Sequence, residues 1–170
     1  MKRIYYDTEF TSMGVDAQLI SAGFASECGQ SWYAEITSFE QERCSAFVLE
    51  TVLPLLDASP EQRFSADDFG SALATWLAGF ADEIELVSDH SVDWYQIEGL
   101  AGENLRALPN RVHPRVWKRS EDKHIRLELE LAESTFWHRR QNRQHHALED
   151  ARRLEYIASL QLKFLQPQSQ

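Results

Sequence analysis

The sequence predicts one α/β domain with a mixed β-sheet flanked by helices. Three strand-like segments follow one another near the N-terminus, helical patterns dominate the rest, and one further apolar strand lies between helices. The 170 residues suffice to bury a full hydrophobic core. A content of 43% hydrophobic and 26% charged residues is typical of a globular protein. We find no linker-like segment, so we expect a single domain over residues 1–170.

Four segments have the composition of strands: residues 3–10, 17–26, 30–37 and 84–88. Segments 17–26 and 30–37 are separated by Glu27, Cys28 and Gly29, a turn sequence that predicts a hairpin. The run at 84–88 is short and largely apolar, which suits a strand buried on both faces.

Capping signals and helical spacing predict the helices. Ser38 and Gln41 form a capping-box pattern for a helix that ends near Leu53. A second helix opens at Ser65, and a third begins near Asp93.

The C-terminal third is less uniform. Residues 105–118 contain two prolines and are expected to be a connecting segment, whereas 121–134 are ambiguous but compatible with a helix. The last helix is expected from about 145 to 164, followed by a frayed tail at 166–170.

Composition also bounds location and partners. No apolar run approaches the ~18 residues that a membrane span needs, and the N-terminus leads straight into a strand pattern. Cys28 and Cys44 are too few for a disulfide scaffold and too far apart for a zinc knuckle, which favours reduced thiols and a cytoplasmic location. The net charge of −10 argues against a nucleic-acid partner, unless carboxylates of a metal site contribute to it. Nine of the 17 basic residues lie within 113–123 and 138–153.

The first candidate site residues are Asp7 and Glu9. Side chains alternate along a strand, so both carboxylates point to one face near the strand's end. Such neighbours repel each other and have raised pKa values unless a cation lies between them. A solvated strand end with two harmless acids is the alternative.

Asp150 and Asp93 are the next candidates. Asp150 lies beside the apolar stripe of the last helix, where a carboxylate needs a metal or a salt bridge to Arg143, Arg152 or Arg153. Asp93 stands at the expected start of a helix and is equally compatible with an N-cap.

Taken together, these motifs resemble those of the DEDDh 3′→5′ exonucleases, and are most similar to the small stand-alone bacterial exoribonucleases among them. Asp7-Thr8-Glu9 resembles the first motif, Asp93 the second, and the run from His145 to Ala151 the third, His-x-Ala-x-x-Asp-Ala. The resemblance implies a ribonuclease H-like fold and two Mg²⁺ or Mn²⁺ ions held by four carboxylates. These are Asp7, Glu9, Asp93 and Asp150. The chain departs from the family in two places. Asp89 stands where the family usually has Asn, so Asp89 is an alternative ligand to Asp93. Phe10 stands where many members have Thr, and the next residue, Thr11, could partly substitute for it.

The general base is one of two adjacent histidines. On a continuous helix, His146 and Asp150 are i, i+4 neighbours, which favours His146. The family pattern places the base five residues before the Asp, at His145. We follow the pattern, and expect His145 to be catalytic and His146 to be a surface residue.

The implied activity is cleavage of single-stranded RNA from its 3′ end, releasing nucleoside 5′-monophosphates. Phe10, Thr11 and Trp94 are the expected substrate contacts, although both aromatic residues also suit the core. Arginines 139, 140 and 143 could hold the substrate backbone. Alternatives are a DNA-directed exonuclease with the same site and a non-catalytic nucleic-acid-binding module. An oligomerisation scaffold would rest on exposed tryptophans at 117 and 137, and the chain could also form a homodimer.

Overall fold

The computed structural model describes residues 1–141 and 143–166. The chain forms a six-stranded mixed sheet in the order β4-β3-β2-β1-β5-β6. Strands β1 to β3 pair antiparallel, β5 and β6 continue the sheet parallel to β1, and β4 pairs parallel with β3. The strands are β1 (Lys2–Phe10), β2 (Leu19–Ser26), β3 (Ser31–Ile36), β4 (Arg63–Phe64), β5 (Ile84–Ser88) and β6 (Val112–Val116).

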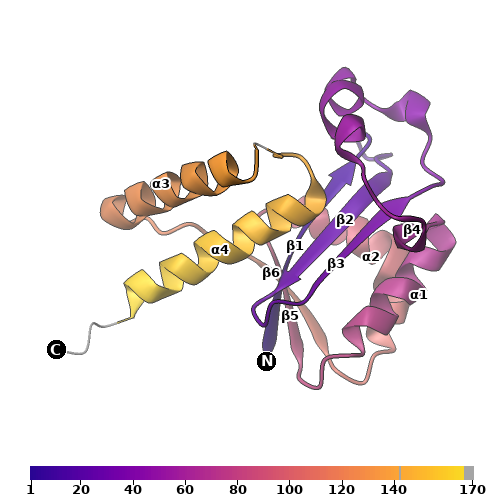
Figure 1. Cartoon of the computed structure of the whole chain (residues 1–170). Coiled ribbons are helices and arrows are strands. Elements are labelled where there is room, and N and C mark those ends of the chain that lie inside the picture. Colours follow the sequence, from indigo (N-terminus) through magenta and orange to yellow (C-terminus); the bar gives the residue numbers. More distant parts are fainter. Residues whose placement is uncertain (142, 167–170) are drawn as a thin grey trace.

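Two pairs of helices cover the two faces of the sheet (Figure 1). Helices α1 (Ala66–Leu77) and α2 (Ser91–Arg106) pack on one face, and α3 (Lys123–Arg139) and α4 (Ala147–Leu165) on the other. The side chains of the central strand alternate accordingly: Ile4 and Tyr6 pack with α1 and α2, and Tyr5 packs with α3 and α4. Asp7 and Glu9 therefore belong to the face covered by α4.

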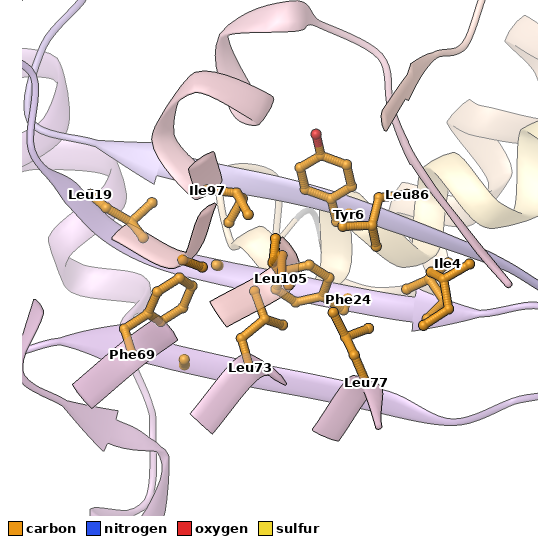
Figure 2. Close-up of a cluster of buried hydrophobic side chains, with 14 of the residues drawn as sticks. Ile4, Tyr6, Leu19, Phe24, Phe69, Leu73, Leu77, Leu86, Ile97 and Leu105 are labelled. Carbon is orange, nitrogen blue, oxygen red and sulfur yellow. The ribbon is translucent and has the colours of Figure 1, made fainter. Parts of the chain in front are cut away.

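The larger core lies between the sheet and helices α1 and α2. Figure 2 shows Phe69, Leu73 and Leu77 of α1 together with Tyr6 and Phe24 of the two central strands. The rings of Tyr6 and Phe24 stack with centroids 5.6 Å apart. This packing fixes β1, whose end carries two of the candidate ligands.

The predicted hairpin and the α1 start are confirmed. Gly29 adopts φ +86°, a left-handed conformation that glycine accepts without a steric penalty, in the turn between β2 and β3. Ser65 caps α1 by accepting a hydrogen bond from the backbone N–H of Asp68. Both features follow from local sequence.

The helix predicted from Ser38 to Leu53 is only partly confirmed. A 3₁₀ turn at Gln41–Arg43 is followed, after residues 44–45, by an irregular helical stretch over 46–55, which is π-helical at Val48–Val52 and 3₁₀ at Leu53–Leu55. The groups that would start the helix are engaged elsewhere, because the Ser38 hydroxyl accepts from the N–H of Ala66 and the N–H of Glu40 donates to Gln18. Long-range hydrogen bonds thus replace the local capping box.

The connecting segment predicted for 105–118 is also partly wrong, since α2 extends to Arg106 and β6 occupies Val112–Val116. Pro114 is compatible with β6 because β6 lies at the sheet edge, where one side of the strand needs no ladder hydrogen bond. Within the ambiguous segment 121–134, residues 123–134 are helical as part of α3, whose N-cap is Asp122. The fraying expected after Gln166 concerns residues outside those described. Within residues 1–141 and 143–166, no helix is long and apolar enough to cross a membrane.

Candidate metal centre

Four acidic side chains from three elements meet at the C-terminal end of β1. Asp7 and Glu9 come from β1, Asp93 from the first turn of α2 and Asp150 from the first turn of α4. Oxygens of Asp7, Glu9 and Asp150 lie within 4.8 Å of one another, as do oxygens of Asp7, Asp89 and Asp93. Asp7 belongs to both groups and so lies at the centre of the cluster.

The approach of α4 to the sheet depends on a glycine. Gly23 of β2 pairs with Asp7 in the antiparallel ladder. A Cβ atom at Gly23 would lie 2.2 Å from the backbone nitrogen of Leu148, closer than any real contact. The missing side chain therefore lets the N-terminus of α4 rest on β2, which brings Asp150 beside Asp7.

Asp93 is buried and its two carboxylate oxygens have different surroundings. Its Oδ1 accepts a hydrogen bond of 2.7 Å from the hydroxyl of Thr8. Its Oδ2 is buried without a hydrogen-bond partner in the part of the chain that the structure describes. An unpaired buried carboxylate oxygen is costly unless a cation binds it. His90, not Asp93, caps α2, through its Nδ1 atom and the N–H of Val92.

Asp89, the alternative ligand, is paired with an arginine. Arg153 donates to Asp89 Oδ2 at 2.7 Å and to Glu133 Oε1 at 2.9 Å. The Nε atom of Arg153 lies 3.9 Å from Asp150, a long contact compared with those two. The charge of Asp89 is thus balanced by protein, and this difference favours Asp93 as the cation ligand.

Burial and mutual repulsion raise the pKa values of the cluster. Burial raises the pKa of Asp7 well above its ordinary range, and the neighbouring carboxylates, Asp150 first, raise it further. The same causes raise the pKa of Glu9 to about 8. Burial raises the pKa values of Asp93 and Asp150 to about 6, although a hydrogen bond from Thr8 and the charge of Arg153 respectively oppose the shift. A divalent cation would relieve this repulsion.

His145 faces the cluster. It adopts φ +67°, and its backbone N–H donates to Asp150 Oδ2 at 2.8 Å. Its ring and the Phe47 ring form a T-shaped pair with centroids 4.9 Å apart. Burial lowers the pKa of His145, so the imidazole is neutral near pH 7 and able to accept a proton.

The expectation that His146 is a surface residue is wrong. His146 is 4% exposed, its Nε2 lies 3.0 Å from Asp57 Oδ1, and its ring stacks on Tyr33 at 4.6 Å. Helix α4 begins at Ala147, and His146 has the extended backbone of an N-cap residue. The i, i+4 argument for His146 therefore fails, because neither histidine lies within the helix.

A cavity of about 590 Å³ contains the carboxylates and His145. Phe10 lines it, as expected. Thr11 and Trp94 are absent from its lining as far as the described residues define it. Thr11 is fully buried and its hydroxyl accepts from the N–H of Gln18, while Trp94 packs against the larger core. The structure gives these two expected contacts no support: the Thr11 hydroxyl supports a loop, and the partly buried Trp94 indole packs against the core.

No sequence pattern pointed to the apolar wall of this cavity. Phe47, Val48 and Met13 contribute apolar surface to its lining, with Phe47 and Met13 52% and 82% exposed. Phe47 lies in the segment expected to be a regular helix, and its ring contacts that of His145.

The basic and tryptophan residues are placed less favourably than expected. Arg143 is paired with Asp57 at 2.7 Å and Arg140 with Glu149 at 3.3 Å, whereas Arg139 is exposed. Trp137 is 7% exposed and Trp117 is half-buried. The scaffold interpretation, which required exposed tryptophans, loses its basis.

No known family model matches the chain. Part of the sequence is similar to two proteins named 3′-5′ exoribonuclease from Mycobacterium tuberculosis, one from strain CDC 1551 / Oshkosh and one from a second strain. Each is 42% identical over 60 residues, which make up 35% of this chain and 36% of the relative. The match thus spans little more than a third of those relatives' length.

The fold is shared with a solved nuclease. The structure of E. coli ExoI in complex with single-stranded DNA, in a zinc-bound form, superposes with a TM-score of 0.60 at 10% sequence identity. The likeness covers 98% of this chain and 41% of that one. The chain therefore has a ribonuclease H-like α/β fold. The chain thus shares its fold with that structure, and about a third of its sequence is similar to proteins named 3′-5′ exoribonuclease.

Proposed function

We propose that this protein is a metal-dependent 3′→5′ exoribonuclease that hydrolyses single-stranded RNA ends to nucleoside 5′-monophosphates. The observation that carries the proposal is the cavity at the end of β1. It brings together the carboxylates of Asp7, Glu9, Asp93 and Asp150 with the neutral imidazole of His145. Residues from three distant parts of the chain converge there, and the same four acids and histidine match the motif pattern of the family.

The acidic residues fit two divalent cations. All donors are carboxylate oxygens, which suit hard ions such as Mg²⁺ or Mn²⁺. The two oxygen groups share Asp7, so this residue would contact both ions, with Glu9 and Asp150 on one side and Asp93 on the other. When bound, the ions would neutralise the cluster, acidify a water molecule and stabilise negative charge on the phosphate.

His145 is the proposed general base. Its pKa is lowered by burial, so at neutral pH its ring is available to accept the proton of an attacking water. Its backbone bond to Asp150 keeps the imidazole adjacent to a proposed ligand. Of the two adjacent histidines, His145 lines the cavity and His146 does not, which supports His145 as the base.

The apolar wall suits a terminal nucleotide base. Phe10 and Phe47 present aromatic surface, and stacking on such rings is a common means of binding single strands without sequence preference. RNA is favoured by the names of the two mycobacterial relatives, and single strands by the DNA-bound ExoI. The same site could serve a DNA-directed exonuclease, because the 2′-OH preference depends on details of the pocket.

The test is incubation of the protein with 5′-labelled single-stranded RNA and with DNA of matched sequence, in Mg²⁺, Mn²⁺ or EDTA. We expect a ladder of products shortened from the 3′ end in either metal, faster on RNA, and intact substrate in EDTA. Faster shortening of DNA would establish the alternative nuclease. Binding without cleavage in every metal would establish the non-catalytic module and refute the proposed function.

A further inference from the structure

The two adjacent histidines have different environments: His145 lines the cavity, whereas His146 is held by residues outside it. His146 is absent from the described cavity lining and lies in a buried site between the Tyr33 ring and Asp57. Because a carboxylate only accepts hydrogen bonds, Nε2 of His146 must carry the proton that is shared with Asp57. This contact joins residues 89 positions apart in the sequence.

Asp57 holds the segment before α4 at two places. Its Oδ1 contacts His146 and its Oδ2 accepts from Arg143 Nη2 at 2.7 Å. Arg143 and His146 flank His145 along the chain. Partial burial on its own would raise the pKa of Asp57, but the hydrogen bonds from His146 and Arg143 outweigh it and lower that pKa, so the carboxylate is charged at neutral pH.

Asp57 is itself anchored to the sheet. The N–H of the next residue, Ala58, donates to Glu35 Oε1 at 2.8 Å, and the hydroxyl of Tyr33 donates to the same oxygen at 3.1 Å. Glu35 lies in β3 and also pairs with Arg63. Asp57 thus connects the loop before α4 to a fixed strand.

His145 requires such support because its backbone is in an unfavourable conformation. A φ of +67° is uncommon for residues other than glycine and persists only where the surroundings enforce it. One support is its N–H bond to Asp150, and another is the Phe47 ring. The backbone of His145 is further constrained through Arg143 and His146, because the side chains of both bind Asp57.

We propose that Asp57 and His146 are positioning residues, which hold the His145 imidazole in the cavity by fixing the backbone on its two sides. The expected effect on turnover rests on the proposed function. The fixing of the backbone around His145 does not depend on it. Neither side chain is among those that line the cavity.

The kinetic test compares Asp57→Ala and Asp57→Asn with Asp82→Ala, an exposed acid between α1 and β5 that serves as the control. With single-stranded RNA we expect kcat to fall roughly 10- to 100-fold in Asp57→Ala, the usual cost of losing a partner that orients a functional residue. KM and the Mn²⁺-induced rise in Tm should stay at wild-type values. Asp57→Asn should recover part of kcat, because an amide oxygen still accepts from His146.

The second test needs no activity and follows hydrogen exchange of the His145 amide by NMR in folded protein. If Asp57 fixes this backbone, the His145 amide should exchange faster in Asp57→Ala than in wild type. The rate should be intermediate in Asp57→Asn and unchanged in Asp82→Ala. Unchanged exchange together with unchanged kcat in both Asp57 variants would overturn the inference. If wild type cleaves neither RNA nor DNA while Asp57→Ala still accelerates exchange, the positioning role stands and the proposed function fails.

Discussion

Gly23 lies opposite Asp7 in the β1–β2 ladder, and backbone atoms of Leu148 occupy the space that a Gly23 side chain would need. The same glycine thus adjoins the centre of the carboxylate cluster and supports the N-terminus of α4. The geometry of the site depends on this contact, because α4 delivers Asp150 and follows directly on His145.

Gly23→Ala should therefore displace α4. The new Cβ would meet backbone rather than a flexible side chain, so we expect a loss of roughly 1–3 kcal/mol in unfolding free energy, the usual cost of overpacking. Nuclease activity and the Mn²⁺-induced rise in Tm should both fall. Gly99→Ala is the matched control: Gly99 lies in α2 with nothing within 4 Å of an added Cβ, so it should gain up to about 1 kcal/mol and keep full activity. Equal behaviour of the two variants would refute the close-contact argument.

Metal binding should stabilise the protein more at high pH than at low pH. The pKa of Glu9 is raised to about 8 and those of Asp93 and Asp150 to about 6, above their values in the unfolded chain. Raised carboxyl pKa values stabilise the folded protein below an unfolded pKa of about 4, and this stability is lost as the pH rises through about 6 to 8. Cations compete with these protons and replace them once the carboxyls ionise.

Thermal melts in Mn²⁺ and in EDTA, at about pH 5.5 and about pH 8.5, measure this linkage. The difference in Tm between the two solutions should be clearly larger at the higher pH. Glu9→Gln, which removes the carboxyl whose pKa is raised to about 8, should reduce the dependence. A pH-independent difference in Tm would show that these groups do not bind the cation.

Asp93 and Asp89 should be distinguishable as ligand and neighbour. Asp93→Asn removes a charge from an unpaired buried oxygen and should abolish turnover. Asp89→Asn weakens the ion pair with Arg153 and should leave a measurable fraction of the turnover rate. Loss of a residue that supports metal ligands typically lowers activity roughly 10- to 100-fold. Turnover rates at saturating Mn²⁺ test the ranking, and the reverse order would make Asp89 the ligand.

His145→Ala should lower kcat by roughly 10²–10⁴-fold, the usual contribution of a general base. The Mn²⁺-induced rise in Tm should remain, because the imidazole is not a proposed ligand. In wild type at saturating metal, the rate should rise with pH as His145 loses its proton, with a midpoint below its ordinary value of about 6.5 because burial lowers its pKa. A variant that keeps this limb would exclude His145 as the base.

Phe47→Ala should weaken binding of the single strand. Removing one stacking platform costs roughly 1–3 kcal/mol, which corresponds to about a 5- to 150-fold higher KM. Folding should be little affected because the ring is 52% exposed. Leu49→Ala, at a 41% exposed position in the same turn, is the control that should leave KM unchanged. Equal KM values in the two variants would remove Phe47 from the substrate site.

Local sequence was sufficient for β1, β2, β3 and β5 and for the acidic residues, but not for β4 and β6. Alternation along residues 3–10 placed Asp7 and Glu9 on one face, and the structure has both on the face covered by α4. The motif around Asp150 located the last helix and the histidine before it. These patterns are short-range, because a strand period or a helix start involves neighbours in the chain.

The partners of these residues were decided by the tertiary structure. The Ser38 hydroxyl binds the N–H of Ala66 rather than starting a helix, and the ring of Phe47 contacts that of His145. Asp57 likewise buries His146, which the sequence alone made a surface residue. The sequence by itself determined which groups could bind metal and accept a proton. The fold determined which of them are buried, paired or free, because those interactions join residues tens of positions apart and depend on how the sheet and α4 pack.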